Sequence, residues 1–136
     1  MSPEALELAK RLGAHPRWEW HDDMIAAVLS RSGEHYMSDP WPACSASLAT
    51  LNGCTHLPDL DSTATVGTLE GLLVEAVRWI NVCNIPHSMG DLDGGMYWEV
   101  TLPGDLFPPG EDEIEGATRG EAVAKALLAA WSVPDG

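Results

Sequence analysis

The longest periodic run of hydrophobic positions lies in the middle of the chain, over residues 63–80. Apolar residues recur there three and four positions apart, which places them on one face of a helix. Ser62 precedes the run and predicts the N-cap, because its hydroxyl can accept a hydrogen bond from a free backbone N–H of the first turn. We expect the apolar face to pack on a sheet. It comprises Val66, Leu69, Leu73, Ala76, Val77 and Ile80.

Two shorter helices are predicted near the ends of the sequence. The first begins at Pro3 and ends at Gly13, residue types favoured in the first turn and just after the last turn. The second begins after Thr118, which has the capping-box spacing to Glu121, and it should end near Val133. The apolar face of the first helix comprises Ala5, Leu8, Ala9 and Leu12, and that of the second comprises Val123, Ala126, Leu127, Ala130 and Trp131.

Alternating and apolar segments predict a β-hairpin after the first helix. Residues 17–20 alternate between polar and aromatic types, and residues 21–23 have the composition of a turn. Residues 24–29 are mainly apolar and supply the second strand, although this run also fits a helical turn.

A third short strand is predicted over residues 34–37. Pro40 and Pro42 should prevent regular pairing beyond it, because proline lacks the N–H group that a paired strand donates. Residues 43–56 are small and weakly patterned, so they predict a loop or a short helix.

The second half of the chain predicts a further set of strands. Asn81–Ile85 begins one, and Met96–Leu102 has the clearest strand pattern of the sequence. Residues 103–110 are too rich in proline and glycine for a central strand. Glu111–Glu115 predicts an acidic loop or an edge strand.

The order of these elements predicts an α+β fold, a mainly antiparallel sheet packed by two or three helices. With 136 residues, the chain has the length of one domain, so we expect residues 1–136 to form a single α+β domain.

The charge of the chain is strongly negative and restricts its partners. Twenty-one acidic against 7 basic residues give a formal net charge of -14, which repels nucleic-acid backbones and anionic membranes. We therefore expect no direct nucleic-acid binding, no membrane association and a preference for a basic partner. The first residues show no secretory signal, and no apolar run approaches the about 18 residues of a membrane span, which predicts a cytoplasmic protein.

The cysteines and histidines offer one hypothetical metal site. Three cysteines without a Cys-x-x-Cys pair argue against a disulfide framework and favour buried thiols. Cys54, His56, Cys83 and His87 could hold zinc if the two loops that carry them converge, but neither spacing is a known zinc-finger pattern. Packing and surface roles are favoured, so we expect no metal and no cofactor.

No catalytic pattern stands out in the sequence. The acidic residues show no paired spacing for acid–base chemistry, and there is no nucleophile elbow or phosphate-binding glycine loop. We expect a protein without enzymatic activity.

Three stretches resemble small accessory proteins encoded by tailed bacteriophages. They are Trp18–Trp20 after Leu12–Gly13, the turn Leu57–Gly67 before the central helix, and the capped helix Ala117–Leu128. That family has a Leu-Pro-Asp-Leu turn before a long helix and no established activity. The resemblance implies a phage or prophage origin, and hence the cytoplasm of an infected bacterial host. Residues 81–95 and 111–115 depart from the family pattern.

Charge and resemblance together predict a non-enzymatic protein that binds a host component. We expect an inhibitor of a bacterial antiviral defence, such as a CRISPR or restriction-type complex, whose carboxylates cover a basic nucleic-acid channel. The predicted acidic surface comprises Asp91, Asp93, Asp105, Glu111, Asp112, Glu113 and Glu115.

Two alternatives stay open. In the first, a homodimer sequesters a small signalling nucleotide, with basic side chains on its phosphates. In the second, the chain is a structural or morphogenetic phage protein with no defence role. A homodimer is expected in any case, because six tryptophans and open sheet edges offer contact area. The ligand-binding residues of the first alternative are Arg17, Trp20, Arg31, Arg78 and Arg119.

Overall fold

The fold consists of helices and antiparallel sheets. A computed structural model describes residues 3–19, 21, 24–29, 36–40, 55–86 and 96–132. These residues contain three helices and two three-stranded sheets, which confirms the α+β class, although the strands form two sheets and not the one expected. The chain divides into two compact units, Met1–Thr68 and Leu69–Gly136, and the single domain expected for residues 1–136 stays a prediction.

Helix α1 (Pro3–Gly13) begins the first unit and has the predicted bounds. Glu4 lies in its first turn, and Lys10 and Arg11 lie in its last turn, so the charges at both ends interact favourably with the helix dipole. Its predicted apolar face is buried, and the helix packs on β3 (Thr55–Pro58). The buried residues are Ala5, Leu8, Ala9 and Leu12.

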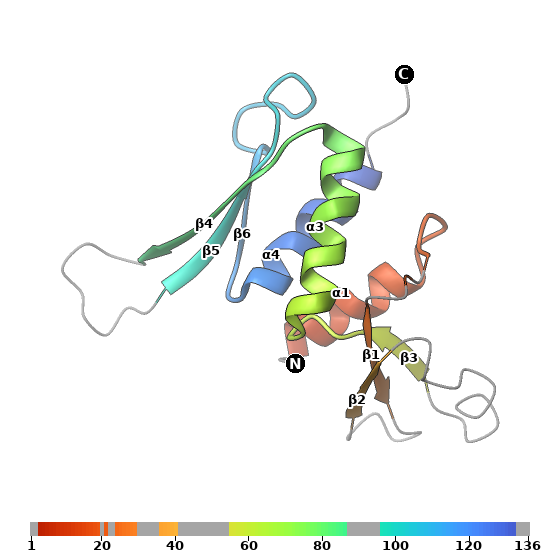
Figure 1. Cartoon of the computed structure of the whole chain (residues 1–136). Helices are drawn as coiled ribbons and strands as arrows, with labels where there is room; N and C mark the ends of the chain where they lie inside the picture. Colours follow the sequence, from red (N-terminus) through yellow and green to blue (C-terminus); the bar gives the residue numbers. More distant parts are fainter. Residues whose placement is uncertain are drawn as a thin grey trace. The chain divides into compact units, whose positions relative to one another are not determined.

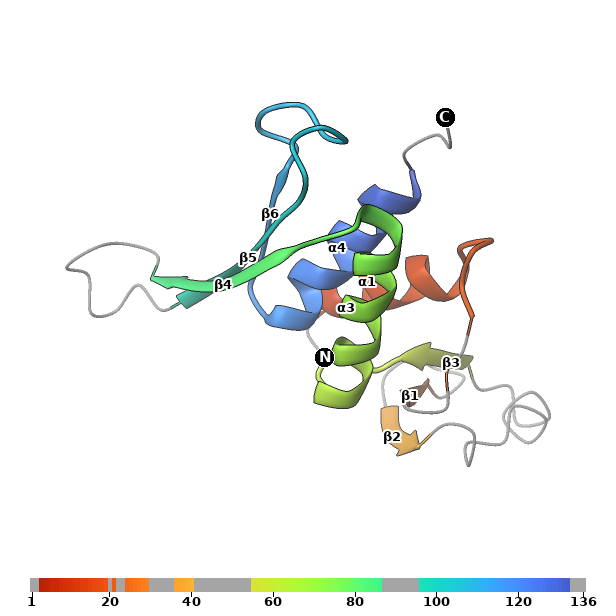
Figure 2. The ribbon, with the colours of Figure 1, turned by 45° about the horizontal axis from the view of Figure 1, so that its top comes forward.

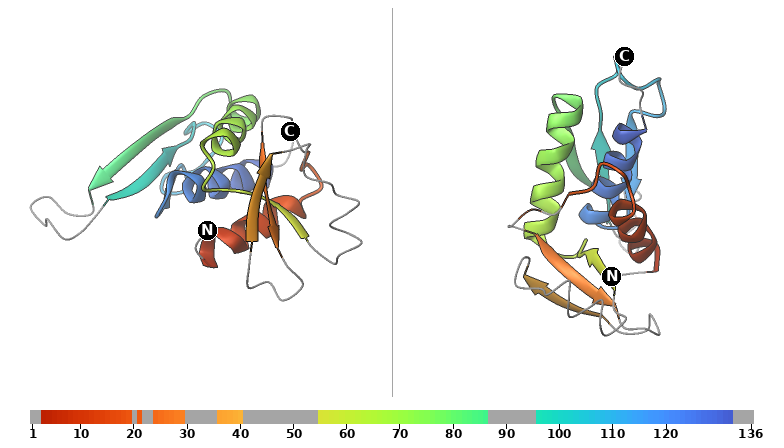
Figure 3. Two further views of the ribbon diagram at one scale, coloured as in Figure 1. Left: turned by 60° about the horizontal axis from the view of Figure 1, so that its bottom comes forward. Right: turned by 90° about the vertical axis from the view of Figure 1, so that its right-hand side faces the viewer.

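Strand β1 (Ile25–Leu29) is the central strand of the first sheet, whose order is β2-β1-β3 (Figure 3). Strand β2 (Tyr36–Pro40) and β3 both pair antiparallel with it. Ala27 of β1 lies opposite Leu57 of β3, and both side chains are buried.

The predicted hairpin between residues 17–20 and 24–29 is wrong. Residues 17–19 form a turn and irregular structure, in which the Trp18 amide donates to the His15 carbonyl at 2.9 Å. The hairpin partner of β1 is β2 instead. An alternating run of only four residues does not distinguish a strand from a turn in which every second side chain is exposed.

Strand β2 continues further than its prolines suggested. Asp39 lies opposite Ala26, and Pro40 lies opposite Ile25. Because β2 is an edge strand, Pro40 can occupy a position whose backbone nitrogen donates no hydrogen bond to a neighbouring strand. Strand β3 was also missed: residues 55–56 fall in the stretch predicted as a loop or short helix.

Helix α3 (Thr63–Val77) begins at a network of side-chain hydrogen bonds. The Ser62 hydroxyl accepts from the Thr65 amide at 3.4 Å, which confirms the predicted cap, and the Asp59 carboxylate accepts from the Asp61 amide at 3.1 Å. The buried Thr65 hydroxyl accepts from the Ile25 amide at 2.8 Å and donates to the Ile25 carbonyl at 3.0 Å. These two bonds fasten the helix start to β1. Figure 2 shows how the chain enters α3 from β3.

Helix α3 ends earlier than the apolar pattern predicted. Arg78 has a φ of 82°, and its amide donates to the Val74 carbonyl at 2.7 Å, the arrangement of a left-handed C-terminal cap. Ile80 therefore lies beyond the helix, and Ala76 is exposed. The other members of the predicted face are buried, namely Val66, Leu69, Leu73 and Val77.

The second unit contains the sheet β4-β5-β6 (Figure 1). Strands β4 (Asn81–Pro86) and β5 (Met96–Thr101) match the predicted strands. For residues 111–115 the sequence predicted an acidic loop or an edge strand, and the structure has an edge strand there, β6 (Glu113–Gly116). All pairs are antiparallel.

Helix α4 (Arg119–Trp131) is capped where the sequence predicted. The Thr118 hydroxyl accepts from the Glu121 amide at 3.2 Å. The Glu121 carboxylate accepts from the Ala117 amide at 3.0 Å, so both end donors are satisfied, although the second one lies one residue before the expected position. Gly116 permits this junction, because a Cβ there would lie 2.4 Å from the Ala122 amide nitrogen.

Leu73→Asp should lower the free energy of unfolding by about 3 kcal/mol or more, because it buries an unpaired charge. Leu73 is 0% exposed, whereas its neighbour Val74 is 40% exposed. The control Val74→Asp should change the free energy by about 0.5 kcal/mol or less. Urea unfolding followed by tryptophan fluorescence measures both, and equal losses would contradict the burial of this face.

Gly116→Ala should destabilise the fold by about 1–3 kcal/mol, because backbone of α4 must move away from the new Cβ. The matched control is Gly67→Ala on α3, where a Cβ meets nothing within 4 Å. That change should stabilise by about 1 kcal/mol through helix propensity. Thermal unfolding compares the two variants, and a neutral Gly116→Ala would refute the close approach.

Candidate functional site

The sheet β4-β5-β6 has one face on helix α4 and one face turned away from it. Val100 of β5 is fully buried, and the Arg119 guanidinium of α4 lies 5.5 Å from the centre of the Trp98 ring, so these two β5 residues mark the helix side. Successive side chains of a strand point to opposite faces, and directly paired residues share a face. The other side is called here the acidic sheet face. It comprises Asn81, Cys83, Ile85, Tyr97, Glu99, Thr101, Glu113 and Glu115.

Three carboxylates gather on the acidic sheet face. Glu99 lies directly opposite Glu115, and Glu113 lies opposite Thr101. Like charges directly opposite each other destabilise a sheet. Burial raises the pKa of Glu99 above its ordinary value, and the negative charges of Glu113 and Glu115 raise it further. From α4, the Lys125 ammonium donates a hydrogen bond to the Glu115 carbonyl oxygen at 3.1 Å.

Tyr97 adds a hydrogen-bonding group beside the carboxylates. Burial raises the pKa of its phenol, and the charges of Glu115, Glu99 and Glu113 add to the effect. A phenol of ordinary pKa, 10.0, is already protonated at neutral pH, and so is this one, so its hydroxyl can donate a hydrogen bond. Cys83 lies directly opposite Glu99 and is half-buried. Its sulfur accepts a hydrogen bond from the side-chain amide of Asn81 at 3.4 Å.

The predicted acidic surface divides into several environments. Glu113 and Glu115 lie on the acidic sheet face. Asp105 forms an exposed ion pair with Arg78. The Asp112 carboxylate accepts from the Gly110 amide at 3.2 Å and so holds its own loop. Asp91 and Asp93 lie outside the described residues, and Glu111 lines the pocket described below.

Glu99 was absent from the predicted acidic surface. The signal for it was present in the strand pattern of residues 96–101, where Trp98 and Val100 occupy the alternate positions. Alternation alone places Glu99 on the side away from these apolar residues. The position of Glu115 directly opposite Glu99 could not be predicted by alternation, because it depends on the register between β5 and β6.

The residues proposed to hold a nucleotide are partly engaged in ion pairs. Arg119 donates two hydrogen bonds to the Glu70 carboxylate, at 2.5 and 3.0 Å, and Arg78 is paired with Asp105. A phosphate group would have to displace these carboxylates. Arg17 belongs to the first unit. Trp20 and Arg31 lie outside the described residues.

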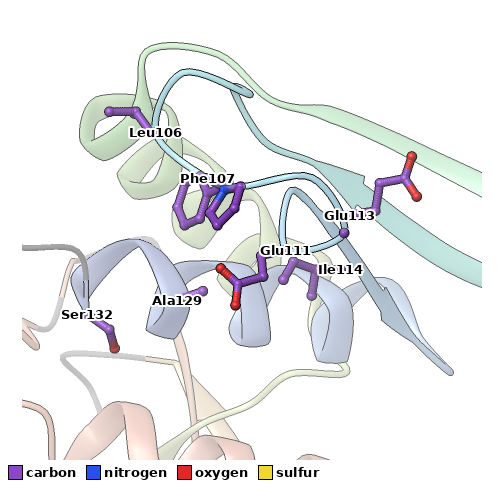
Figure 4. A pocket seen from close by; sticks show the side chains of 9 residues that line it. Leu106, Phe107, Glu111, Glu113, Ile114, Ala129 and Ser132 are labelled. Atoms are coloured by element: carbon purple, nitrogen blue, oxygen red, sulfur yellow. The ribbon is translucent and has the colours of Figure 1, made fainter.

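A pocket of about 530 Å³ opens between the loop before β6 and the end of α4 (Figure 4). Its apolar wall includes Phe107, Ile114 and Ala129. In Figure 4 the Glu111 carboxylate lies between Phe107 and Ala129, and the Glu113 carboxylate points away from Phe107. We call this cavity the loop pocket. Its lining comprises Leu106, Phe107, Pro108, Gly110, Glu111, Glu113, Ile114, Ala129 and Ser132.

The expectation of no metal at Cys54, His56, Cys83 and His87 stays a prediction. The part of the chain that the structure describes contains no group of three or more His, Cys, Asp or Glu side chains arranged so that they could hold one metal ion. Cys54 and His87 lie outside that part, as does the side chain of His56.

Comparison of the chain with protein-family models, with curated proteins and with solved structures found no significant match. In the described residues, no helix combines the length and the apolar composition that crossing a membrane requires.

Glu99→Gln should stabilise the protein at neutral pH, with a gain that disappears on acidification. The folded pKa of Glu99 lies above its ordinary value of 4.5, so ionisation disfavours the folded state. This destabilisation is complete above the folded pKa and absent below the unfolded pKa, and stability falls as the pH rises between them. Urea titrations from about pH 3.5 to 7.5 measure the difference. The control Glu75→Gln removes one exposed charge on α3. A gain independent of pH would contradict the crowding of carboxylates.

Proposed function

We propose that this chain is a non-enzymatic binding protein whose acidic sheet face holds a basic partner. The observation that carries the proposal is the placement of Glu99 directly opposite Glu115, with Glu113 on the same face. Burial, and after it the charges of Glu113 and Glu115, raise the pKa of Glu99, so ionised Glu99 is disfavoured in the free protein. Basic side chains of a partner would favour ionised Glu99, because they place opposite charges beside the carboxylates.

The partner is a host protein or a protein–nucleic-acid complex with a basic surface. With a net charge of -14, the chain would attract such a surface from a distance, an effect that salt weakens. The same charge supports neither direct nucleic-acid binding nor binding to an anionic membrane. Carboxylates on a sheet face would compete with phosphates for the Lys and Arg side chains of a nucleic-acid channel.

The resemblance to phage accessory proteins extends this proposal to a biological setting. We propose that the chain acts in the cytoplasm of an infected bacterial host, as an inhibitor of an antiviral complex of the CRISPR or restriction type. A structural or morphogenetic role in the phage particle is the alternative, and it requires no basic nucleic-acid-binding partner. Nucleotide sequestration is less favoured, because Arg78 and Arg119 already pair with carboxylates.

The homodimer belongs to the same proposal. Strands β4 and β6 are the edges of their sheet, and their outward backbone groups can pair with another chain. Self-association through such an edge would leave the acidic sheet face open to the partner and would present two copies of it.

Affinity capture from host lysate should separate these roles. The triple variant Glu99→Gln, Glu113→Gln, Glu115→Gln removes the charges of the acidic sheet face. The control triple variant Glu7→Gln, Glu19→Gln, Glu75→Gln removes the same charge from exposed positions elsewhere. We expect the wild type and the control to capture a basic nucleic-acid-binding complex, the first triple variant to lose it, and retention to fall as salt is raised.

Two results would contradict the proposal. Equal capture by both triple variants would show that the acidic sheet face is not the binding surface. Absence of any captured host complex, together with co-purification of the chain with virions, would support the structural role. A nucleotide that raises the melting temperature of the wild type would favour sequestration.

A further inference from the structure

The loop pocket combines an apolar wall with negative charge. Phe107, Ile114 and Ala129 supply apolar surface from a loop, a strand and a helix. The Glu111 carboxylate supplies the charge, whereas the Glu113 carboxylate points away from Phe107 (Figure 4). The lining, all of which the structure describes, contains no basic side chain. With about 530 Å³, the pocket falls in the size range of small-molecule sites, so it has room for an inserted side chain.

Backbone hydrogen bonds hold the loop side of the pocket. The Phe107 amide donates to the Pro103 carbonyl at 3.2 Å, and the Glu111 amide donates to the Pro108 carbonyl at 2.9 Å. Gly110 adopts a φ of 91°, which glycine tolerates without strain. Because these bonds form in the free protein, an occupant would not have to order the loop, and binding would lose less entropy.

The chemistry of the lining restricts the occupant. A small hydrophilic cation would leave the exposed Leu106 and the half-buried Ile114 of the lining in contact with water. A neutral hydrocarbon would cover these side chains but would remove water from the Glu111 carboxylate without replacing its hydrogen bonds. An apolar side chain flanked by Lys or Arg suits both the apolar lining and the carboxylates. It covers the apolar lining, and its basic neighbours can pair with the carboxylates.

Glu113 connects the pocket to the acidic sheet face. Its carboxylate lies on the sheet face by register, and the residue also belongs to the pocket lining. One segment of a partner could therefore contact Glu111 and Glu113 with basic side chains while a residue between them enters the pocket.

We propose that the loop pocket receives an apolar side chain from a basic segment of the partner protein, with flanking Lys or Arg residues on Glu111 and Glu113. This inference rests on the proposed function for the charge of the partner, and it adds the apolar anchor that the partner must carry. Partners that are merely polycationic would contact the carboxylates and leave the pocket empty.

Two acetylated and amidated pentapeptides test the inference, Lys-Lys-Leu-Lys-Lys and its matched form with Ser in place of Leu. Isothermal titration calorimetry at low salt measures their Kd values. We expect the Leu peptide to bind the wild type about tenfold more tightly than the Ser peptide. Ala129→Leu places a larger side chain in the pocket wall, which narrows the space for the peptide Leu, and should reduce this preference. The control Ala64→Leu makes the same change at an exposed helical position and should keep it.

A second measurement keeps the test independent of how well Ala129→Leu folds. Methyl NMR of the wild type should show shifts of Ile114 with the Leu peptide and not with the Ser peptide. Glu111→Gln should weaken the binding of both peptides and flatten its salt dependence.

The outcomes separate the pocket from the acidic sheet face. Equal binding of both peptides to the wild type would overturn the pocket inference and leave the proposed function intact. A Leu preference that is not reduced in a folded Ala129→Leu variant, without a shift of Ile114, would also overturn it. If neither peptide binds at low salt, the proposed function fails together with the pocket.

Discussion

The pairing register between β5 and β6 is the constraint on which the second unit depends. It places Val100 opposite Ile114 on the helix side, where Val100 is fully buried. The same register must place Glu99 opposite Glu115 on the other side, because successive strand residues alternate between faces. A slip of one residue would turn the apolar set toward solvent. A one-residue change of register therefore cannot relieve the repulsion between these two carboxylates without losing the core.

The short junction between β6 and α4 fixes where α4 starts relative to the strand, and so determines which residues line the loop pocket. Gly116 lets the first turn of α4 approach the strand, and Thr118 and Glu121 satisfy the backbone donors at that point. With a rise of about 1.5 Å per residue, the helix then carries Ala129 about 15 Å along its axis, where it meets Phe107 and Ile114. The pocket is thus a consequence of where the helix starts, and it depends on the absence of a Cβ at Gly116.

The helices could be predicted from the sequence because each has three or more turns of periodic apolar residues with a recognisable cap. The end of α3 was missed, since the left-handed backbone at Arg78 has no signature in a residue that is not glycine. Strands β2 and β3 were missed or cut short because edge positions tolerate Pro40 and Pro58. Glu99 could have been found by alternation. The loop pocket could not, because only tertiary packing brings Phe107 beside Ala129.

The balance of charges explains why recognition would use both surfaces. The chain has 7 basic residues against 21 acidic ones, and Arg78 and Arg119 are already paired with Asp105 and Glu70. Counter-charge for the acidic sheet face must come largely from outside the chain, either from dissolved ions or from a partner. Charge alone would select any polycation, and salt would screen it. An apolar pocket beside the carboxylates adds a contact that salt does not screen, so a partner with an apolar residue between basic ones would be distinguished from the rest.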